Sequence, residues 1–83
     1  MEKSIHTAQQ KKLQNLLRQI RREADLRQAE LAGKLGEPQS FVSKYETGER
    51  RLDILEVRKI CKAIGISLEE FARRLEECLL EDC

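Results

Sequence analysis

The side chains with the clearest chemical use lie between residues 28 and 48. This stretch is typical of two short amphipathic helices joined by a tight turn at residues 36–38, Gly-Glu-Pro. On the second of these helices the apolar residues share one side, and the other side carries hydrogen-bonding groups: Gln39, Ser40, Ser43, Lys44 and Thr47. Such groups donate and accept hydrogen bonds, but they form no catalytic constellation. We therefore interpret the stretch as a DNA-reading element.

Catalytic and metal-binding chemistry finds little support elsewhere in the sequence. His6 is the only histidine, so one chain can assemble neither a Ser-His-Asp arrangement nor a histidine-based metal site. The sequence has no glycine-rich phosphate loop. The acidic pairs at residues 69–70 and 76–77 fall on an exposed helical face, where solubility is the better interpretation. We expect no enzyme activity, no metal and no cofactor.

The three cysteines are Cys61, Cys78 and Cys83. Their number is odd and their spacing contains no CxxC, so they indicate neither a disulfide framework nor a zinc site. Cys61 falls on the apolar side of an expected helix, and we predict that it is a small core residue.

Length and composition favour one small helical domain. The chain has 83 residues, of which 37% are charged and 4% aromatic, with four glycines and one proline. It contains no apolar run long enough to span a membrane and no secretory signal, so we expect a cytoplasmic protein. The net charge is only +1 but is unevenly distributed: residues 1–62 hold 14 Lys and Arg against 9 Asp and Glu, whereas residues 63–83 hold 2 against 6.

Apolar periodicity and capping residues predict five helices. We expect the first at about 8–24 after a Thr7 cap, the second from Gln28 to a stop at Gly36, the third at about 39–47, the fourth between Asp53 and Gly65, and the fifth after Ser67. Arg27 is a poor cap for the second helix because it has no acceptor oxygen, which should weaken this helix start by about 1 kcal/mol.

The sequence resembles the lambda repressor/Cro-like helix-turn-helix family, also called XRE. The resemblance rests on Gln-Ala-Glu-Leu-Ala at 28–32, Gly36, and Ser-Lys-Tyr-Glu-Thr-Gly at 43–48. It implies an all-α, compact five-helix bundle in which helices 2 and 3 form the helix-turn-helix. We therefore divide the chain into a flexible N-terminal segment at 1–7, a single helix-turn-helix domain at 8–80 and a tail at 81–83.

The resemblance also implies roles for individual residues. The third helix would enter the DNA major groove, where Gln39, Ser40, Ser43 and Lys44 would contact bases. Gln28, Arg50 and Arg51 would contact the DNA backbone. Arg21 and Glu46 would form a structural ion pair between the first and third helices.

Proteins of this kind usually bind a two-fold operator as dimers, so we expect a homodimer on double-stranded DNA. The fifth helix continues beyond the length needed to close the bundle, and the candidate interface residues are Leu75, Cys78, Leu79 and Leu80. We predict a sequence-specific transcriptional regulator, most simply a repressor. Two narrower roles remain open, an antitoxin-type regulator with a toxin partner and a restriction-modification controller protein. A protein-interaction module without DNA binding is a third alternative, since the net charge is nearly neutral.

Overall fold

The computed structural model describes residues 8–80. Its helices are α1 (Ala8–Glu23), α2 (Gln28–Leu35), α3 (Gln39–Thr47), α4 (Ile54–Ile64) and α5 (Leu68–Leu80). These bounds agree with the sequence prediction, except that α1 ends one residue early. The described residues contain no strand, so the expected all-α class is confirmed. Residues 1–7 and 81–83 lie outside the described part. The structure therefore does not test the expectations for Thr7, His6 and Cys83.

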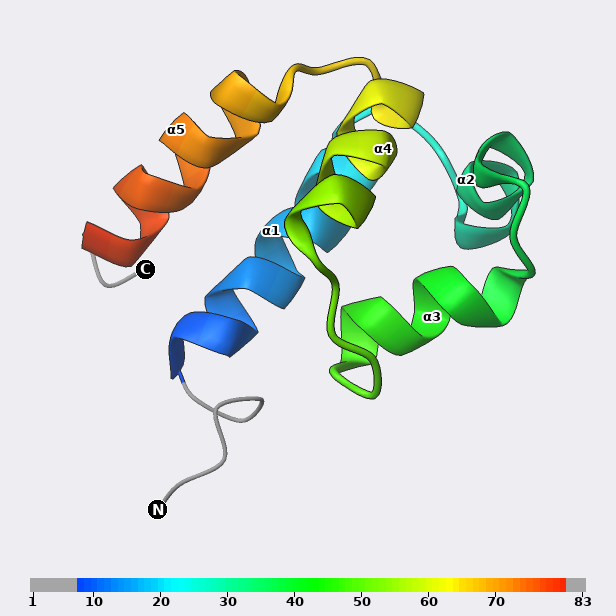
Figure 1. The fold of residues 1–83 in the computed structure, drawn as a ribbon, viewed down its shortest axis with the longest axis horizontal. Coiled ribbons are helices and arrows are strands. Elements are labelled where there is room, and N and C mark those ends of the chain that lie inside the picture. The colour runs from blue at the N-terminus through cyan, green and yellow to red at the C-terminus, as the bar shows by residue number, and fades with distance from the viewer. Residues whose placement is uncertain (1–7, 81–83) are drawn as a thin grey trace.

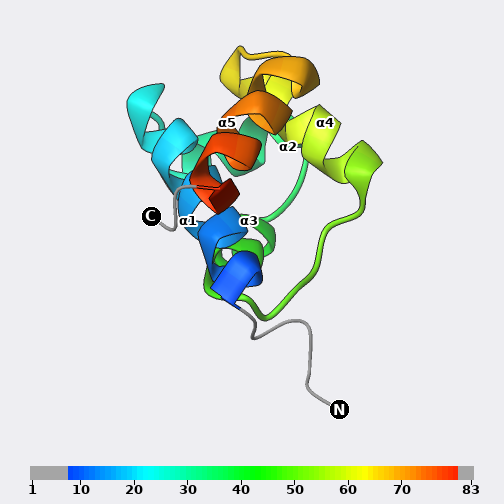
Figure 2. The same ribbon diagram turned by 90° about the vertical axis from the view of Figure 1, so that its left-hand side faces the viewer.

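The five helices form a bundle in which α2 and α3 occupy one end. Helix α4 crosses in front of α1, and α5 lies beside α1 at the other end of the bundle (Figure 1). A view turned by 90° shows α5 on the side of α1 that faces away from α2 (Figure 2). Helix α2 packs against α3 and α4, while α1 packs against α3 and α5. The helix-turn-helix therefore packs on α1 and α4, and α5 packs on these two helices in turn.

The core consists of apolar side chains from every helix. Residues at most 2% exposed include Leu17 and Ile20 of α1, Leu31 of α2, Val42 of α3 and Ile60 of α4. Phe71 of α5 closes the core and is 3% exposed. These residues belong to the apolar stripes seen in the sequence. In a small bundle each helix buries one face, and its apolar residues lie on that face.

The cysteines divide between core and surface. Cys61 is fully buried, as predicted, and burial raises the pKa of its thiol to about 11. Cys78 takes part in a disulfide bond. The expectation that the cysteines form no disulfide is therefore wrong for Cys78, because an odd number of cysteines without CxxC spacing does not decide whether one pair forms.

The turn between α2 and α3 is determined by two residues with special backbone properties. Gly36 adopts a left-handed conformation with φ of 70°, and the N–H of Glu37 donates to the carbonyl of Ala32 at 3.0 Å. Pro38 then occupies the N-cap of α3 with φ of −73°. Glycine ends helices readily in this conformation, and proline has no N–H that would lack a partner at a helix start. The predicted turn is thus present.

The end of α3 depends on a second glycine. Gly48 has φ of 91°. A Cβ atom at this position would lie 2.8 Å from Nε2 of Gln14, a buried side chain of α1. The left-handed backbone and the close approach to the Gln14 side chain therefore both favour glycine here.

The helix starts differ in how well they are capped. Asp53 accepts from the N–H of Glu56 at 2.8 Å and the Glu56 carboxylate accepts from the N–H of Asp53, which forms a capping box at the predicted start of α4. Ser67 accepts from the N–H of Glu70 at 3.0 Å. Arg27 makes no side-chain cap for α2, as expected from its chemistry.

Candidate nucleic-acid interface

A buried ion pair ties α3 to α1. Nε of Arg21 donates to Oε2 of Glu46 at 2.7 Å, and Nη2 of Arg21 donates to Oε1 at 3.0 Å. The Glu46 side chain is fully buried and that of Arg21 is 8% exposed. The hydrogen bonds that Arg21 donates to Glu46 raise the pKa of Arg21. Nη1 of Arg21 also donates to the carbonyl of Leu26 at 2.8 Å, so the pair holds the chain between α1 and α2 as well.

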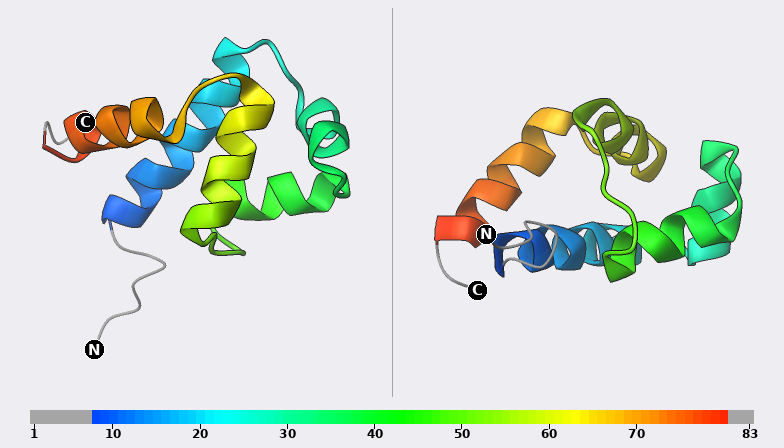
Figure 3. Two further views of the ribbon diagram at one scale, coloured as in Figure 1. Left: turned by 45° about the horizontal axis from the view of Figure 1, so that its top comes forward. Right: turned by 60° about the horizontal axis from the view of Figure 1, so that its bottom comes forward.

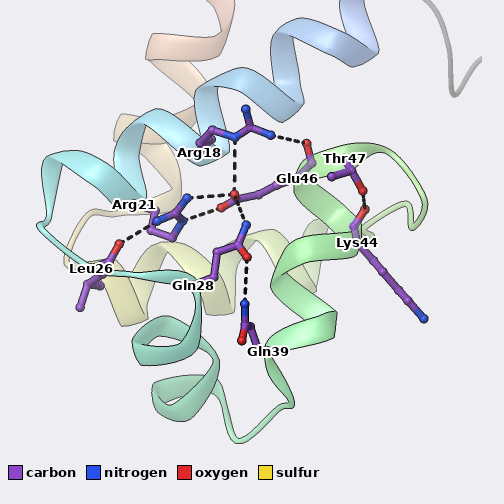
Figure 4. A network of polar contacts seen from close by, with 8 residues as sticks. All are labelled: Arg18, Arg21, Leu26, Gln28, Gln39, Lys44, Glu46 and Thr47. Carbon is purple, nitrogen blue, oxygen red and sulfur yellow. Dashed lines mark hydrogen bonds and ion pairs between the residues drawn. The ribbon is translucent and has the colours of Figure 1, made fainter.

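Glu46 is the centre of a larger polar network (Figure 4). Nε2 of Gln28, the first residue of α2, donates to Oε1 of Glu46 at 3.0 Å. Arg18 of α1 adds an ion pair at 3.6 Å and donates to the Glu46 carbonyl at 3.4 Å. One carboxylate therefore connects three helices, and its buried charge is surrounded by donors, which a carboxylate in a low-dielectric site requires.

The network extends to the surface through Gln39. Its Nε2 donates to Oε1 of Gln28 at 3.3 Å. Gln28 is half-buried whereas Gln39 is exposed, so the chain of contacts runs from the buried Glu46 outward to the first residue of α3. This connection restricts the orientation of an exposed amide that would otherwise rotate freely.

The remaining base-contact candidates lie along the same helix. Ser40 and Lys44 are exposed and Ser43 is half-buried. Lys44 points away from the network (Figure 4). A shallow hollow beside α3 is lined by Ser40, Lys44 and Arg50, together with Glu37, Pro38 and Phe41. The sequence did not predict that Glu37 lines this hollow, because Glu37 lies in the turn and is not part of the apolar periodicity of either helix.

Arg50 makes two intramolecular contacts. Its Cζ atom lies 4.9 Å from the centroid of the Phe41 ring, and it forms an ion pair with Glu56 of α4. These contacts fix the loop after α3 against α4. Its side chain nevertheless remains 42% exposed, and Arg51 is also exposed.

The four predicted interface residues of α5 do not share one environment. Leu75 is partly buried and packs against the core, Leu79 is half-buried, and Leu80 is 79% exposed. Cys78 is half-buried and disulfide-bonded, and its carbonyl accepts from Nζ of Lys12 at 3.5 Å. An apolar surface at this end of α5 is therefore centred on Leu79 and Leu80.

Comparison with known proteins establishes the family. A family model described as helix-turn-helix matches residues 17–71, which include α2, α3 and the whole Glu46 network. The chain belongs to this helix-turn-helix family. The solved structure of an XRE-family like protein from Pseudomonas syringae pv. tomato str. DC3000 is similar over 89% of this chain and 90% of that one, with 44% sequence identity and a TM-score of 0.80. A search of curated proteins found no match.

Membership confirms the resemblance seen in the sequence. XRE-type helix-turn-helix proteins are DNA-binding and regulatory in kind, so this chain is a DNA-binding helix-turn-helix regulator. Within residues 8–80 no helix is long and apolar enough to cross a membrane.

Proposed function

We propose that this helix-turn-helix protein is a sequence-specific transcriptional regulator that places α3 in the major groove of DNA. A major groove admits one helix and presents a distinct donor and acceptor pattern for each base pair. Gln39, Ser40, Ser43 and Lys44 supply matching groups on one side of α3. The observation that carries the proposal is the contact from Gln39 through Gln28 to Glu46, which orients an exposed amide at the end of the helix nearest the bases.

The start of α2 supports a contact to the DNA backbone. Arg27 provides no side-chain cap, so N–H groups of the first turn remain available to donate to a phosphate oxygen. Gln28 lies at this position and has a second amide hydrogen beyond the one it donates to Glu46. Arg50 and Arg51 follow α3 and extend the backbone contact, Arg50 with a guanidinium already held by Phe41 and Glu56.

Specificity then comes from pairing two copies. One helix contacts few base pairs, and dimers of this class bind half-sites about 34 Å apart. The Leu75, Cys78, Leu79 and Leu80 surface of α5 is the dimer interface in this proposal. A dimer on a two-fold operator that overlaps a promoter acts as a repressor by occlusion.

Selection of bound sites from a pool of random duplex DNA tests the proposal. We expect an enriched motif with two inverted half-sites separated by about one helical turn. A single unrepeated half-site would contradict the dimer. Recovery of no motif, together with retention on random DNA that does not depend on salt, would favour a protein-interaction module instead.

A further inference from the structure

A second surface with unusual charge lies between α2 and α4. A shallow hollow there is lined by Lys34 and Leu35 at the end of α2 and by Leu55, Arg58, Lys59 and Lys62 of α4. These four α4 residues have the spacing i, i+3, i+4 and i+7, so they share one helical face, and Ala63 completes the lining. The cations on this face are Arg58, Lys59 and Lys62. They lie next to Leu55, an apolar side chain that is 72% exposed.

Within the described residues, no ion pair compensates the positive charge of this face. Arg58 and Lys62 are four residues apart, an arrangement that destabilises a helix because like charges repel. No acid lines the hollow, and no ion pair reaches these three cations from residues 8–80. Glu56 on the same helix is already paired with Arg50, and with Glu37 it lines a neighbouring hollow that Lys59 also borders. Lys34 contributes to the lowered pKa of Glu30, whose main cause is the backbone hydrogen bond from Arg27.

The other charged helix face shows the contrast. On α5, Arg73 pairs with Glu70 and Glu77, at 2.6 and 2.9 Å. Arg74 pairs with Glu23 of α1 at 2.8 Å. On α5, both arginines are thus paired with acids of the chain. The cations of the α2–α4 hollow have no such pair within residues 8–80 and could pair with acids of another molecule.

The hollow does not belong to the DNA-reading face. Helices α1 and α3 lie along one side of the bundle and α4 lies on the opposite side, with α2 rising from one side to the other (Figure 3). In the close view, α4 runs behind the network of Gln28, Gln39 and Glu46 (Figure 4). A duplex held against α3 would therefore leave the hollow open.

We propose that the α2–α4 hollow binds an acidic, amphipathic helical segment of a partner protein. Carboxylates of the segment would pair with Arg58, Lys59 and Lys62, and one apolar side chain would pack on Leu55. Ile54, which is 63% exposed, extends the apolar area at the start of α4. The apolar component favours a protein over a nucleic acid, since phosphates would need the cations alone. A regulator bound to DNA could thus recruit or be controlled by an acidic partner without releasing its site.

Fluorescence anisotropy with a labelled synthetic helix built from glutamate, alanine and leucine tests this proposal. We expect the full chain to bind this peptide and to ignore the same peptide with every glutamate replaced by glutamine. Lys59→Glu/Lys62→Glu should weaken binding by about tenfold or more, and Leu55→Ser by about threefold to tenfold. The matched control Lys11→Glu/Arg22→Glu changes the net charge equally on exposed residues of α1 and should change the affinity by less than about threefold.

Four results would overturn the proposal. The first is that no peptide binds at millimolar concentration, and the second is that the α4 and α1 variants lose equal peptide affinity. The third is that Lys59→Glu/Lys62→Glu selectively loses binding to random duplex DNA. The fourth is that this variant sediments differently from wild type. The third result would assign the hollow to nucleic acid and the fourth to a second copy of the chain. Circular dichroism melting of each variant controls for folding. Binding of the selected DNA site should stay unchanged in the α4 variants, so failure here is distinguishable from failure of the proposed function.

Discussion

Glu46 is a fully buried carboxylate that accepts hydrogen bonds from Arg21 and Gln28. Removing one member of such a pair leaves the other charge in a site without water, which costs far more than the loss of an exposed pair. At the scale of single residues, α3 is thus anchored by one carboxylate on its buried side.

We predict that Glu46→Ala lowers the free energy of unfolding by about 3–5 kcal/mol, because it strands the buried guanidinium of Arg21. Glu49→Ala changes an exposed residue outside the network and should stay within about 0.5 kcal/mol of wild type. Urea denaturation followed by circular dichroism measures both. Equal unfolding midpoints for the two variants would remove the structural role of Glu46.

A double-mutant cycle tests whether Gln28 orients Gln39. If the hydrogen bond between them fixes the amide of Gln39, then Gln39→Ala should cost less DNA affinity in a Gln28→Ala background. We expect a coupling of about 0.5–1.5 kcal/mol, measured as binding of the four proteins to the selected site. Additive losses would mean that each glutamine contacts DNA independently.

The glycines of α2 and of the two helix ends that follow differ in their surroundings. The αL glycines Gly36 and Gly48 both end helices, but only Gly48 also touches a neighbouring helix. Gly33 lies inside α2, and a Cβ atom added there would have no neighbouring atom within 4 Å. Substitution of Gly33 therefore tests helix propensity, and substitution of Gly36 tests the backbone conformation. Substitution of Gly48 tests the backbone conformation together with packing.

We predict opposite signs for alanine substitutions at these glycines. Gly33→Ala should stabilise the fold by about 0.5–1 kcal/mol through helix propensity. Gly36→Ala should destabilise it by about 1–2 kcal/mol, the cost of a left-handed residue with a Cβ. Gly48→Ala should destabilise it further, by about 2–4 kcal/mol, because its Cβ also displaces the Gln14 side chain. Thermal melts order the three variants, and a Gly48→Ala variant more stable than Gly36→Ala would contradict the close packing.

Acid should loosen the contact between α1 and α5. Two hydrogen bonds from Arg74, with help from Gln19, lower the pKa of Glu23 from 4.5 to about 2. Because the folded pKa lies below the unfolded pKa, the pair stabilises the fold above pH 4.5 and loses this effect as the pH falls toward 2. Both side chains are partly exposed, so the effect stays below about 1 kcal/mol.

Melting temperatures between pH 7 and pH 2 for wild type and Glu23→Gln measure this contribution. We expect wild type to be the more stable at pH 7 and the two curves to converge near pH 2. Glu76→Gln, an exposed acid on α5, is the control and should follow wild type throughout. Parallel curves for wild type and Glu23→Gln would show that the ion pair adds no stability.

For the whole molecule, the local features were predictable from sequence and the long-range contacts were not. Asp53, Ser67, Gly36 and Gly48 act on their own helix ends, so their residue types sufficed to place helix boundaries. The link from Gln39 to Gln28 and the contact of Arg50 with Glu56 depend on how helices cross, which periodicity does not specify. For the same reason Lys34 could not be assigned to a hollow shared with α4.

The oligomeric state is a property of the whole molecule. If Leu79 and Leu80 form the dimer interface, then Leu79→Glu should shift the protein to monomer in sedimentation at micromolar concentration, because a charge at an apolar contact is left without a partner. Glu76→Gln, on the same helix, should leave the assembly unchanged. A wild-type monomer that Leu79→Glu does not alter would exclude this surface.

In the proposed function, α3 contacts bases whereas the loop after it contacts the DNA backbone. Binding of wild type, Lys44→Ala and Arg51→Ala to the selected site and to random duplex DNA, at several salt concentrations, separates these two roles. Lys44→Ala should weaken binding to the selected site by about 1–3 kcal/mol and leave binding to random DNA much less affected, while Arg51→Ala should weaken both alike. Equal losses on both DNAs for Lys44→Ala, with selective loss for Arg51→Ala, would contradict this assignment of roles.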